Sequence, residues 1–171
     1  MELRFRKATI DDLECILEIY RAGVANMQQT GIDQWDETYP AEKDVRLDIS
    51  RSDLYLCMCD GEIAAVYAVN TIVDPEYNDA DWQYPDIPWC AMHRLCVSPD
   101  FHRRGIATAV MKNIESQALS EGFGAVHLDT FSGNHRALGV YQKLGYKEVG
   151  EAHWAKGRFV IMEKKIDPKN L

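Results

Sequence analysis

The segment from Trp89 to Thr108 constrains the fold of this chain more than any other part of the sequence. Trp89–Val97 is an apolar run typical of a buried strand. A short loop with basic residues and Gly105 follows it, and a helical pattern then continues to Ser120. A strand that leads directly into a helix is typical of a domain in which helices cover a sheet. The segment therefore predicts an α/β fold.

The remaining hydrophobic patterns extend this prediction along the chain. An Asp60-Gly61 pair between two apolar runs indicates a β-hairpin, because glycine accepts a positive φ. Thr9, followed three residues later by Asp12, predicts the start of a helix. The expected strands are 3–8, 54–59, 62–69, 89–97, 125–131, 146–154 and 158–166. The expected helices are 10–20, 105–120 and 134–144. A further short helix is expected after Pro40, and it carries Val45, Leu47 and Ile49. This order predicts one domain over 1–171 with a central mixed sheet of about six to seven strands flanked by about four helices.

Composition excludes several classes of protein. The 171 residues include 19 Lys and Arg against 27 Asp and Glu, a formal net charge of −8, which disfavours a nucleic-acid partner. No apolar run approaches the roughly 18 residues of a membrane helix. The first residues alternate apolar and charged side chains, unlike a signal peptide. We therefore expect a cytoplasmic protein with no membrane partner.

The five cysteines do not form a recognisable metal site. Cys57 and Cys59 are two residues apart within an apolar run, and pairs with the spacing of metal ligands are missing. We expect reduced thiols and no bound metal.

The loop after the 89–97 strand could bind an anion. The N–H groups at the start of a helix lack partners within the helix, and small residues allow a phosphate to approach the main chain. Arg103 and Arg104 add positive charge, whereas Gly105 and Ala107 lack bulk. On spacing alone, an ordinary strand-to-helix turn is an equal alternative.

This loop resembles the central motif of the GNAT N-acetyltransferase family, [QR]-x-x-G-x-[GA]. The match is His102-Arg103-Arg104-Gly105-Ile106-Ala107, with His102 in place of Gln or Arg. The resemblance implies a GNAT-like fold and acetyl-CoA as the co-substrate. It implies that the main chain of Leu95, Cys96 and Val97 pairs with the pantetheine arm, and that the pyrophosphate is held by His102, Arg103, Arg104, Gly105, Ile106, Ala107 and Thr108.

A second segment, Asn134–Tyr146, resembles the family's N-x-x-A-x-x-x-Y-x-x-x-G-[FY] helix. Asn134 and Tyr141 are seven residues apart, so they project from one face of a helix. The resemblance implies that Asn134 and Ala137 contact the coenzyme and that Tyr141 lies near its sulfur as the general acid for the thiolate. A packed helical aromatic is the alternative for Tyr141.

The general base is less strongly indicated. His93 lies four residues before Val97, and an unperturbed histidine accepts protons near neutral pH. His127 is a weaker candidate, and packing within the sheet is the alternative for His93. We assign no cysteine as nucleophile, because the family transfers the acetyl group directly. The position of Cys96 within a strand favours packing.

Two acidic segments that contain aromatic residues could bind an amine acceptor. The segments are 33–39, with Trp35 and Tyr39, and 74–82, with Trp82. Aromatic rings beside carboxylates suit a cationic ligand. The alternative is that these are solvated loops whose aromatic residues pack inward.

The resemblance implies an acetyl-CoA-dependent N-acetyltransferase that acts on a primary amine of a small molecule. A protein or peptide acceptor is an alternative within the same class. An alternative from another class is a catalytically silent coenzyme-A-binding domain. A homodimer is compatible with the sequence.

Overall fold

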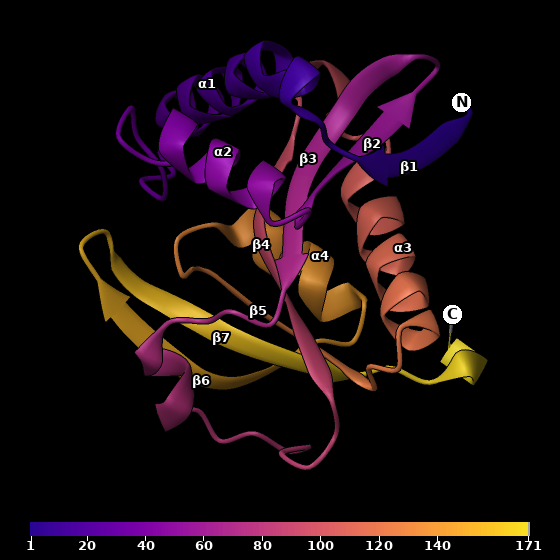
Figure 1. Ribbon diagram of the computed structural model, residues 1–171. Helices are drawn as coiled ribbons and strands as arrows, with labels where there is room; N and C mark the ends of the chain where they lie inside the picture. The colour runs from indigo at the N-terminus through magenta and orange to yellow at the C-terminus, as the bar shows by residue number, and fades with distance from the viewer. Residues whose placement is uncertain (171) are drawn as a thin grey trace. The chain divides into compact units, whose positions relative to one another are not determined.

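The computed structural model describes residues 1–170 and confirms the predicted fold class (Figure 1). The described chain forms four α-helices and seven strands in the predicted order. The helices are α1 (Leu13–Gln29), α2 (Glu42–Ser50), α3 (Ile106–Ser120) and α4 (His135–Lys143). The strands are β1 (Leu3–Lys7), β2 (Leu54–Cys59), β3 (Glu62–Asn70), β4 (Trp89–Val97), β5 (Ala125–Phe131), β6 (Lys147–Trp154) and β7 (Gly157–Lys165).

The strands form a mixed sheet in the order β1-β2-β3-β4-β5-β7-β6. Strands β4 and β5 pair in parallel, whereas the pairs β1–β2, β2–β3, β5–β7 and β6–β7 are antiparallel. A parallel pair needs a crossover connection, and α3 supplies it between β4 and β5. The predicted mixed sheet with its helices is therefore confirmed.

The chain divides into two compact units. Unit 1 comprises Met1–Val69 and Arg94–Val110, and unit 2 comprises Asn70–His93 and the chain from Met111 onward. Strand β4 and helix α3 each pass from one unit to the other. The single domain expected over 1–171 stays a prediction.

Unit 1 contains the antiparallel strands β1–β3 and helices α1 and α2. Asp60 and Gly61 both have positive φ, at 50° and 94°, which gives the predicted tight hairpin. Leu13, Ile16 and Tyr20 form a buried stripe on α1, as 3.6-residue periodicity requires. The core also contains the predicted Val45.

Two apolar residues of unit 1 are more exposed than their predicted helices suggested. Ile10 belongs to a 3-10 turn, Ile10–Asp12, that precedes α1, and 52% of its surface is exposed. Leu47 is 46% exposed on α2, whereas Val45 is buried. Residues two apart on a helix point in different directions, so only one of this pair faces the core.

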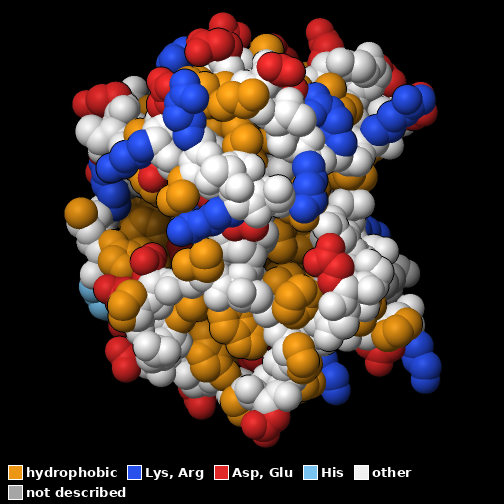
Figure 2. Space-filling view, in the orientation of Figure 1, with side chains coloured by type: hydrophobic (Ala, Val, Ile, Leu, Met, Phe, Trp, Pro, Cys, Tyr) orange, Lys and Arg blue, Asp and Glu red, His pale blue; other side chains and the backbone are white. Residues whose placement is uncertain are grey.

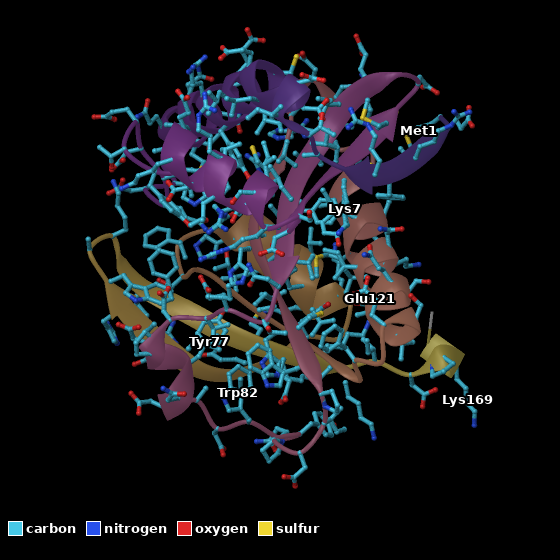
Figure 3. The ribbon with its side chains drawn as sticks, viewed as in Figure 1. Met1, Lys7, Tyr77, Trp82, Glu121 and Lys169 are labelled. Carbon is cyan, nitrogen blue, oxygen red and sulfur yellow. The ribbon has the colours of Figure 1, made fainter. Side chains whose placement is uncertain are left out.

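Unit 2 contains β5, β6, β7, α4 and the first part of β4. The long connection before β4 includes a 3-10 segment, η2 (Pro75–Asp79). Tyr77 of η2 and the nearby Trp82 lie close together (Figure 3), with ring centroids 5.8 Å apart. Both rings pack against a cluster that includes Val149 and Ile161. The aromatic residues of this acidic connection therefore anchor it to the sheet of unit 2.

The surface charges are mixed in sign. On the face drawn in Figure 2, acidic and basic side chains lie interspersed with hydrophobic ones. Within the described residues, every helix is too short or too polar to cross a membrane.

Candidate functional site

The turn from β4 into α3 is a tight loop with open space beside Gly105. A 3-10 turn, Pro99–Phe101, follows β4, and Arg103 and Gly105 then adopt positive φ values of 62° and 76°. A Cβ placed on Gly105 would meet no atom within 4 Å. A glycine with a positive φ next to open space is where a ligand can approach the main chain.

Charges near this turn favour an anion. The first N–H groups of α3 lack partners within the helix, and the helix dipole places partial positive charge there. Arg103 and Arg104 are both exposed. The Arg104 guanidinium lies 5.1 Å from the centroid of the Phe101 ring, and Phe101 is buried. Ile106 is also buried and anchors the first turn of α3 in unit 1.

His102 occupies the position where the sequence departs from the family motif. Its Nε2 lies 3.1 Å from the carbonyl oxygen of Val97, at the end of β4. The ring nitrogen donates in this contact, because a carbonyl oxygen only accepts. His102 therefore fastens the loop to the end of β4, and the structure places the predicted residues Val97 and His102 in direct contact.

Cys96 is a packing residue, as its position within a strand predicted. Its side chain is buried in the core of unit 1, and burial raises its pKa to about 12. Helix α1 approaches so closely at Gly23 that a Cβ there would lie 2.5 Å from the sulfur. A thiol with this pKa is not a nucleophile at neutral pH.

Helix α4 of unit 2 holds the residues of the second motif. The Asn134 side chain accepts a hydrogen bond from the N–H of Ala137 at 3.1 Å and so caps the helix. Tyr141 is 6% exposed, and its ring meets Tyr146 edge to face. Burial, and then the charge of Asp129, raise the pKa of Tyr141, so its hydroxyl keeps its proton at neutral pH.

His93 belongs to unit 2 and lies where β4 passes between the units. Its Nε2 is 2.9 Å from the Oδ1 of Asn70. The amide oxygen only accepts, so in the neutral ring this nitrogen carries the proton and Nδ1 carries the lone pair. That tautomer is compatible with a general base.

His127, the weaker candidate for the base, is buried within an aromatic stack. The Trp82 ring lies 3.8 Å and the Trp89 ring 4.7 Å from its centroid. Burial lowers the pKa of His127 to about 4, so the ring is neutral at pH 7. The Glu163 carboxylate is 3.4 Å from its Nε2, beyond hydrogen-bonding geometry. A ring with this burial favours packing over proton transfer.

The three predicted acceptor residues lie in different surroundings. Trp35 is 6% exposed and packs edge to face on Tyr20 in the core of unit 1, which favours the inward-packed alternative. Trp82 is half-buried, and its indole N–H donates to the carbonyl oxygen of Tyr77. Tyr39 is 40% exposed, and its hydroxyl lies 3.1 Å from a nitrogen of Arg94. Tyr39 therefore presents the most surface of the three.

Several polar residues near the predicted positions were missed. Arg94 forms a two-pronged ion pair with the buried Asp48, and Asp129 accepts a hydrogen bond from Tyr77 at 2.6 Å. The one available signal was a charged residue within an apolar strand, which applies to both Arg94 and Asp129. Within the described part of the chain, no group of three or more His, Cys, Asp or Glu side chains could hold a metal ion.

The predicted residues fall in both units. Unit 1 contains Trp35, Tyr39, Leu95, Cys96, Val97 and the loop from His102 to Thr108. Unit 2 contains Trp82, His93, Asn134, Ala137 and Tyr141.

Comparisons with known proteins identify the family of this chain. The acetyltransferase (GNAT) family model matches residues 21–146. Over 55 residues the chain is 38% identical to an acetyltransferase of Pectobacterium atrosepticum, a match that covers 32% of this chain and 39% of that protein. The chain thus spans less than half the length of this curated relative.

Solved structures share the fold across nearly the whole chain. A GNAT-family acetyltransferase from Streptococcus agalactiae superposes with a TM-score of 0.86 at 22% identity and covers 96% of both chains. The ribosomal-protein-S18-alanine N-acetyltransferase from Escherichia coli superposes with a TM-score of 0.71 at 17% identity and covers 99% of both chains. At these identities the likeness to solved structures shows the fold alone. The family model, however, matches most of the sequence. This chain therefore belongs to the acetyltransferase (GNAT) family.

Proposed function

We propose that this chain is an acetyl-CoA-dependent N-acetyltransferase that transfers the acetyl group directly to a primary amine of a small molecule. The observation that carries the proposal is the turn into α3. There Gly105 combines a φ of 76° with open space where a side chain would lie, in the position of the family's pyrophosphate loop. Family membership supports acetyl transfer, and the residues of this loop fit the group they would bind.

Two features of the loop suit a pyrophosphate. The N–H groups at the start of α3 point out of the helix and can donate to phosphate oxygens. Arg103 and Arg104 are exposed beside them and can pair with the negative charge. His102 fixes the loop through the Val97 carbonyl oxygen, so its role in this proposal is to position the backbone.

The reaction joins the amine nitrogen to the thioester carbonyl carbon and breaks the carbon–sulfur bond. The attacking amine must be neutral, whereas an alkylamine in water has a pKa near that of lysine, about 10.4. His93 is proposed to accept its proton, directly or through water. The departing thiolate takes a proton from Tyr141, whose raised pKa keeps the hydroxyl protonated until then.

The acceptor is proposed to be a small molecule rather than a protein. The chain carries a net charge of −8, which favours encounter with a cationic amine. In the segment 33–39, Tyr39 is exposed and follows the carboxylates of Asp36 and Glu37, which suits a cationic ligand. One structural neighbour is named for a ribosomal-protein alanine, so a peptide acceptor belongs among the alternatives to test.

A turnover screen tests the proposal. The chain is incubated with acetyl-CoA and a panel of alkylamines, amino acids, polyamines and peptides, and released coenzyme A is separated by chromatography. Chromatography is preferable to a thiol-reactive dye because Cys15 is exposed and would add background. We expect release that depends on a small amine.

The other outcomes separate the alternatives. Release with peptides alone would assign the chain to protein modification. Binding of acetyl-CoA without release for any acceptor would identify a silent coenzyme-A-binding domain. A chain that binds no acetyl-CoA would overturn the proposal.

A further inference from the structure

We propose that Tyr39 contacts the acceptor amine and that Arg94 is a positioning residue, which holds the Tyr39 side chain in place. Together the two residues would set acceptor specificity. This inference rests on the proposed function. All the residues that carry it belong to unit 1: Tyr20, Tyr39, Asp48 and Arg94.

Arg94 is fixed at both its side chain and its backbone. Its Nε and Nη2 donate to the two oxygens of Asp48 at 2.7–2.9 Å. Asp48 is 3% exposed on α2, so this ion pair is largely withdrawn from water. The hydroxyl of Tyr20 donates to the Arg94 carbonyl oxygen at 2.9 Å. A guanidinium held in this way has a defined orientation.

The backbone of Arg94 is unusual for a strand. Its φ is 52°, a left-handed conformation that costs a residue other than glycine free energy. The contacts to Asp48 and Tyr20 offset this cost. The bend lies directly before Leu95, the first residue of the stretch that family resemblance assigns to the pantetheine arm of acetyl-CoA.

The remaining nitrogen of Arg94, Nη1, reaches the segment 33–39, which lies between α1 and α2. It donates to the Tyr39 hydroxyl at 3.1 Å. The backbones of Asp36 and Tyr39 exchange hydrogen bonds in both directions, and the Asp36 carboxylate accepts from the N–H and the hydroxyl of Thr38. The loop is thus ordered from within, and the Arg94 side chain fastens it to β4.

Tyr39 is the exposed aromatic residue of this loop. The residue is 40% exposed, whereas Trp35, four residues earlier, is in the core. An exposed aromatic face with its hydroxyl held in place suits the alkyl or cationic part of an amine acceptor. Asp33, Asp36 and Glu37 precede Tyr39 and add negative charge to the same segment.

The experiment measures kcat and KM for three variants, Tyr39→Phe, Arg94→Lys and their combination, with the amine that turns over best in the screen described above. Tyr39→Phe removes one hydroxyl from an exposed ring and should leave the fold intact. Losing the hydrogen bond should raise the KM for the amine by about two- to tenfold, with kcat and acetyl-CoA affinity little changed. Arg94→Lys keeps the charge but loses the fork that spans Asp48 and Tyr39, and should raise the same KM.

The double variant separates positioning from general stability. If Arg94 acts through the Tyr39 hydroxyl, the combined effect equals that of one substitution alone. If Arg94 were merely structural, the effects of the two substitutions on KM would add. The change in KM would then be accompanied by a fall in the melting temperature. Tyr84→Phe is the matched control, because Tyr84 is 37% exposed and also lies beside a basic side chain, that of Lys165.

The failure of this inference is distinguishable from the failure of the proposed function. The roles of Tyr39 and Arg94 would be overturned if active Tyr39→Phe had the same KM for the amine as the wild type. Additive effects on KM in the double variant would overturn them as well. Either result would leave the proposed function standing. Absence of turnover with every amine in the wild type would overturn the proposed small-amine acceptor, and with it the roles of Tyr39 and Arg94 toward that acceptor.

Discussion

At the scale of single residues, burial determines the protonation states available for chemistry. Burial raises the pKa of both Tyr141 and Cys96, so the phenol and the thiol are neutral at pH 7. A neutral phenol can donate a proton, whereas a neutral thiol is a poor nucleophile. These protonation states are compatible with the direct acetyl transfer proposed above.

Tyr141→Phe should reduce turnover far more than coenzyme binding. The substitution keeps the ring and its edge contact with Tyr146 but removes the proposed proton donor. We expect kcat to fall by about 10²-fold, the lower range for general acid catalysis. Steady-state kinetics and acetyl-CoA titration of the same preparation measure the two effects.

Tyr146→Phe is the control for this substitution. Its hydroxyl donates to the buried Glu115, so its loss should lower thermal stability while kcat stays near wild type. Wild-type kcat in Tyr141→Phe, under conditions where chemistry limits the rate, would remove Tyr141 from the mechanism.

The residues that sequence analysis singled out most securely are those defined by local spacing. Gly105 lies in the predicted turn with a positive φ, and Asn134 lies at the start of the predicted helix, whereas their contacts with the coenzyme stay predictions. The Arg94–Asp48 pair joins residues 46 positions apart, and spacing carries no information about such a contact. The pair determines how Tyr39 is held, so this part of the candidate site required the structure.

At the scale of elements, aromatic residues fasten the two acidic connections to the sheet or helix beside them. Trp35 packs against α1 through Tyr20, and Trp82 stacks on His127 of β5. Alternation of acidic and aromatic residues predicted amine-binding loops, but it does not distinguish a ring that packs inward from one that faces a ligand. The exposed fraction of each side chain makes that distinction.

Trp35→Ala should destabilise unit 1. Removing a buried indole leaves a cavity beside Tyr20, and the free energy of unfolding should fall by about 3–5 kcal/mol. Equilibrium denaturation by urea measures this change. Tyr39→Ala, in the same loop but at an exposed position, is the control and should shift the free energy far less. Equal shifts for both variants would contradict the placement of Trp35 in the core.

His127 should make stability depend on pH. Its pKa is about 4 in the folded protein and about 6.5 when unfolded, so below pH 6.5 the unfolded chain binds more protons. Its contribution to stability is therefore complete above pH 6.5 and is lost as the pH falls toward 4. The free energy of unfolding should decrease by at most about 1.4 kcal/mol per pH unit from this group.

His127→Phe provides the comparison, because it keeps an aromatic ring between Trp82 and Trp89 but cannot titrate. Its unfolding free energy should depend less on pH between 6.5 and 4 than that of the wild type. Equal slopes for wild type and His127→Phe would show that His127 does not titrate as its burial implies.

At the scale of the whole molecule, the fold is kept while the sequence varies. A structural neighbour superposes with a TM-score of 0.86 although only 22% of aligned residues are identical. The order of strands and helices could be predicted because each element has its own hydrophobic period. The acceptor could not, because pockets on one fold serve different substrates and depend on side chains brought together from distant parts of the chain.

The most direct test of the account is calorimetric titration of acetyl-CoA into the wild type, Gly105→Glu and Gly122→Glu. Both glycines have positive φ, 76° and 90°, and a Cβ at either would meet no atom within 4 Å, so the two substitutions impose comparable strain and charge. The account predicts saturable binding by the wild type, a similar affinity for Gly122→Glu, and strongly weakened binding for Gly105→Glu with its circular dichroism unchanged. Wild-type affinity in Gly105→Glu would contradict the assignment of the 102–108 loop as the coenzyme site.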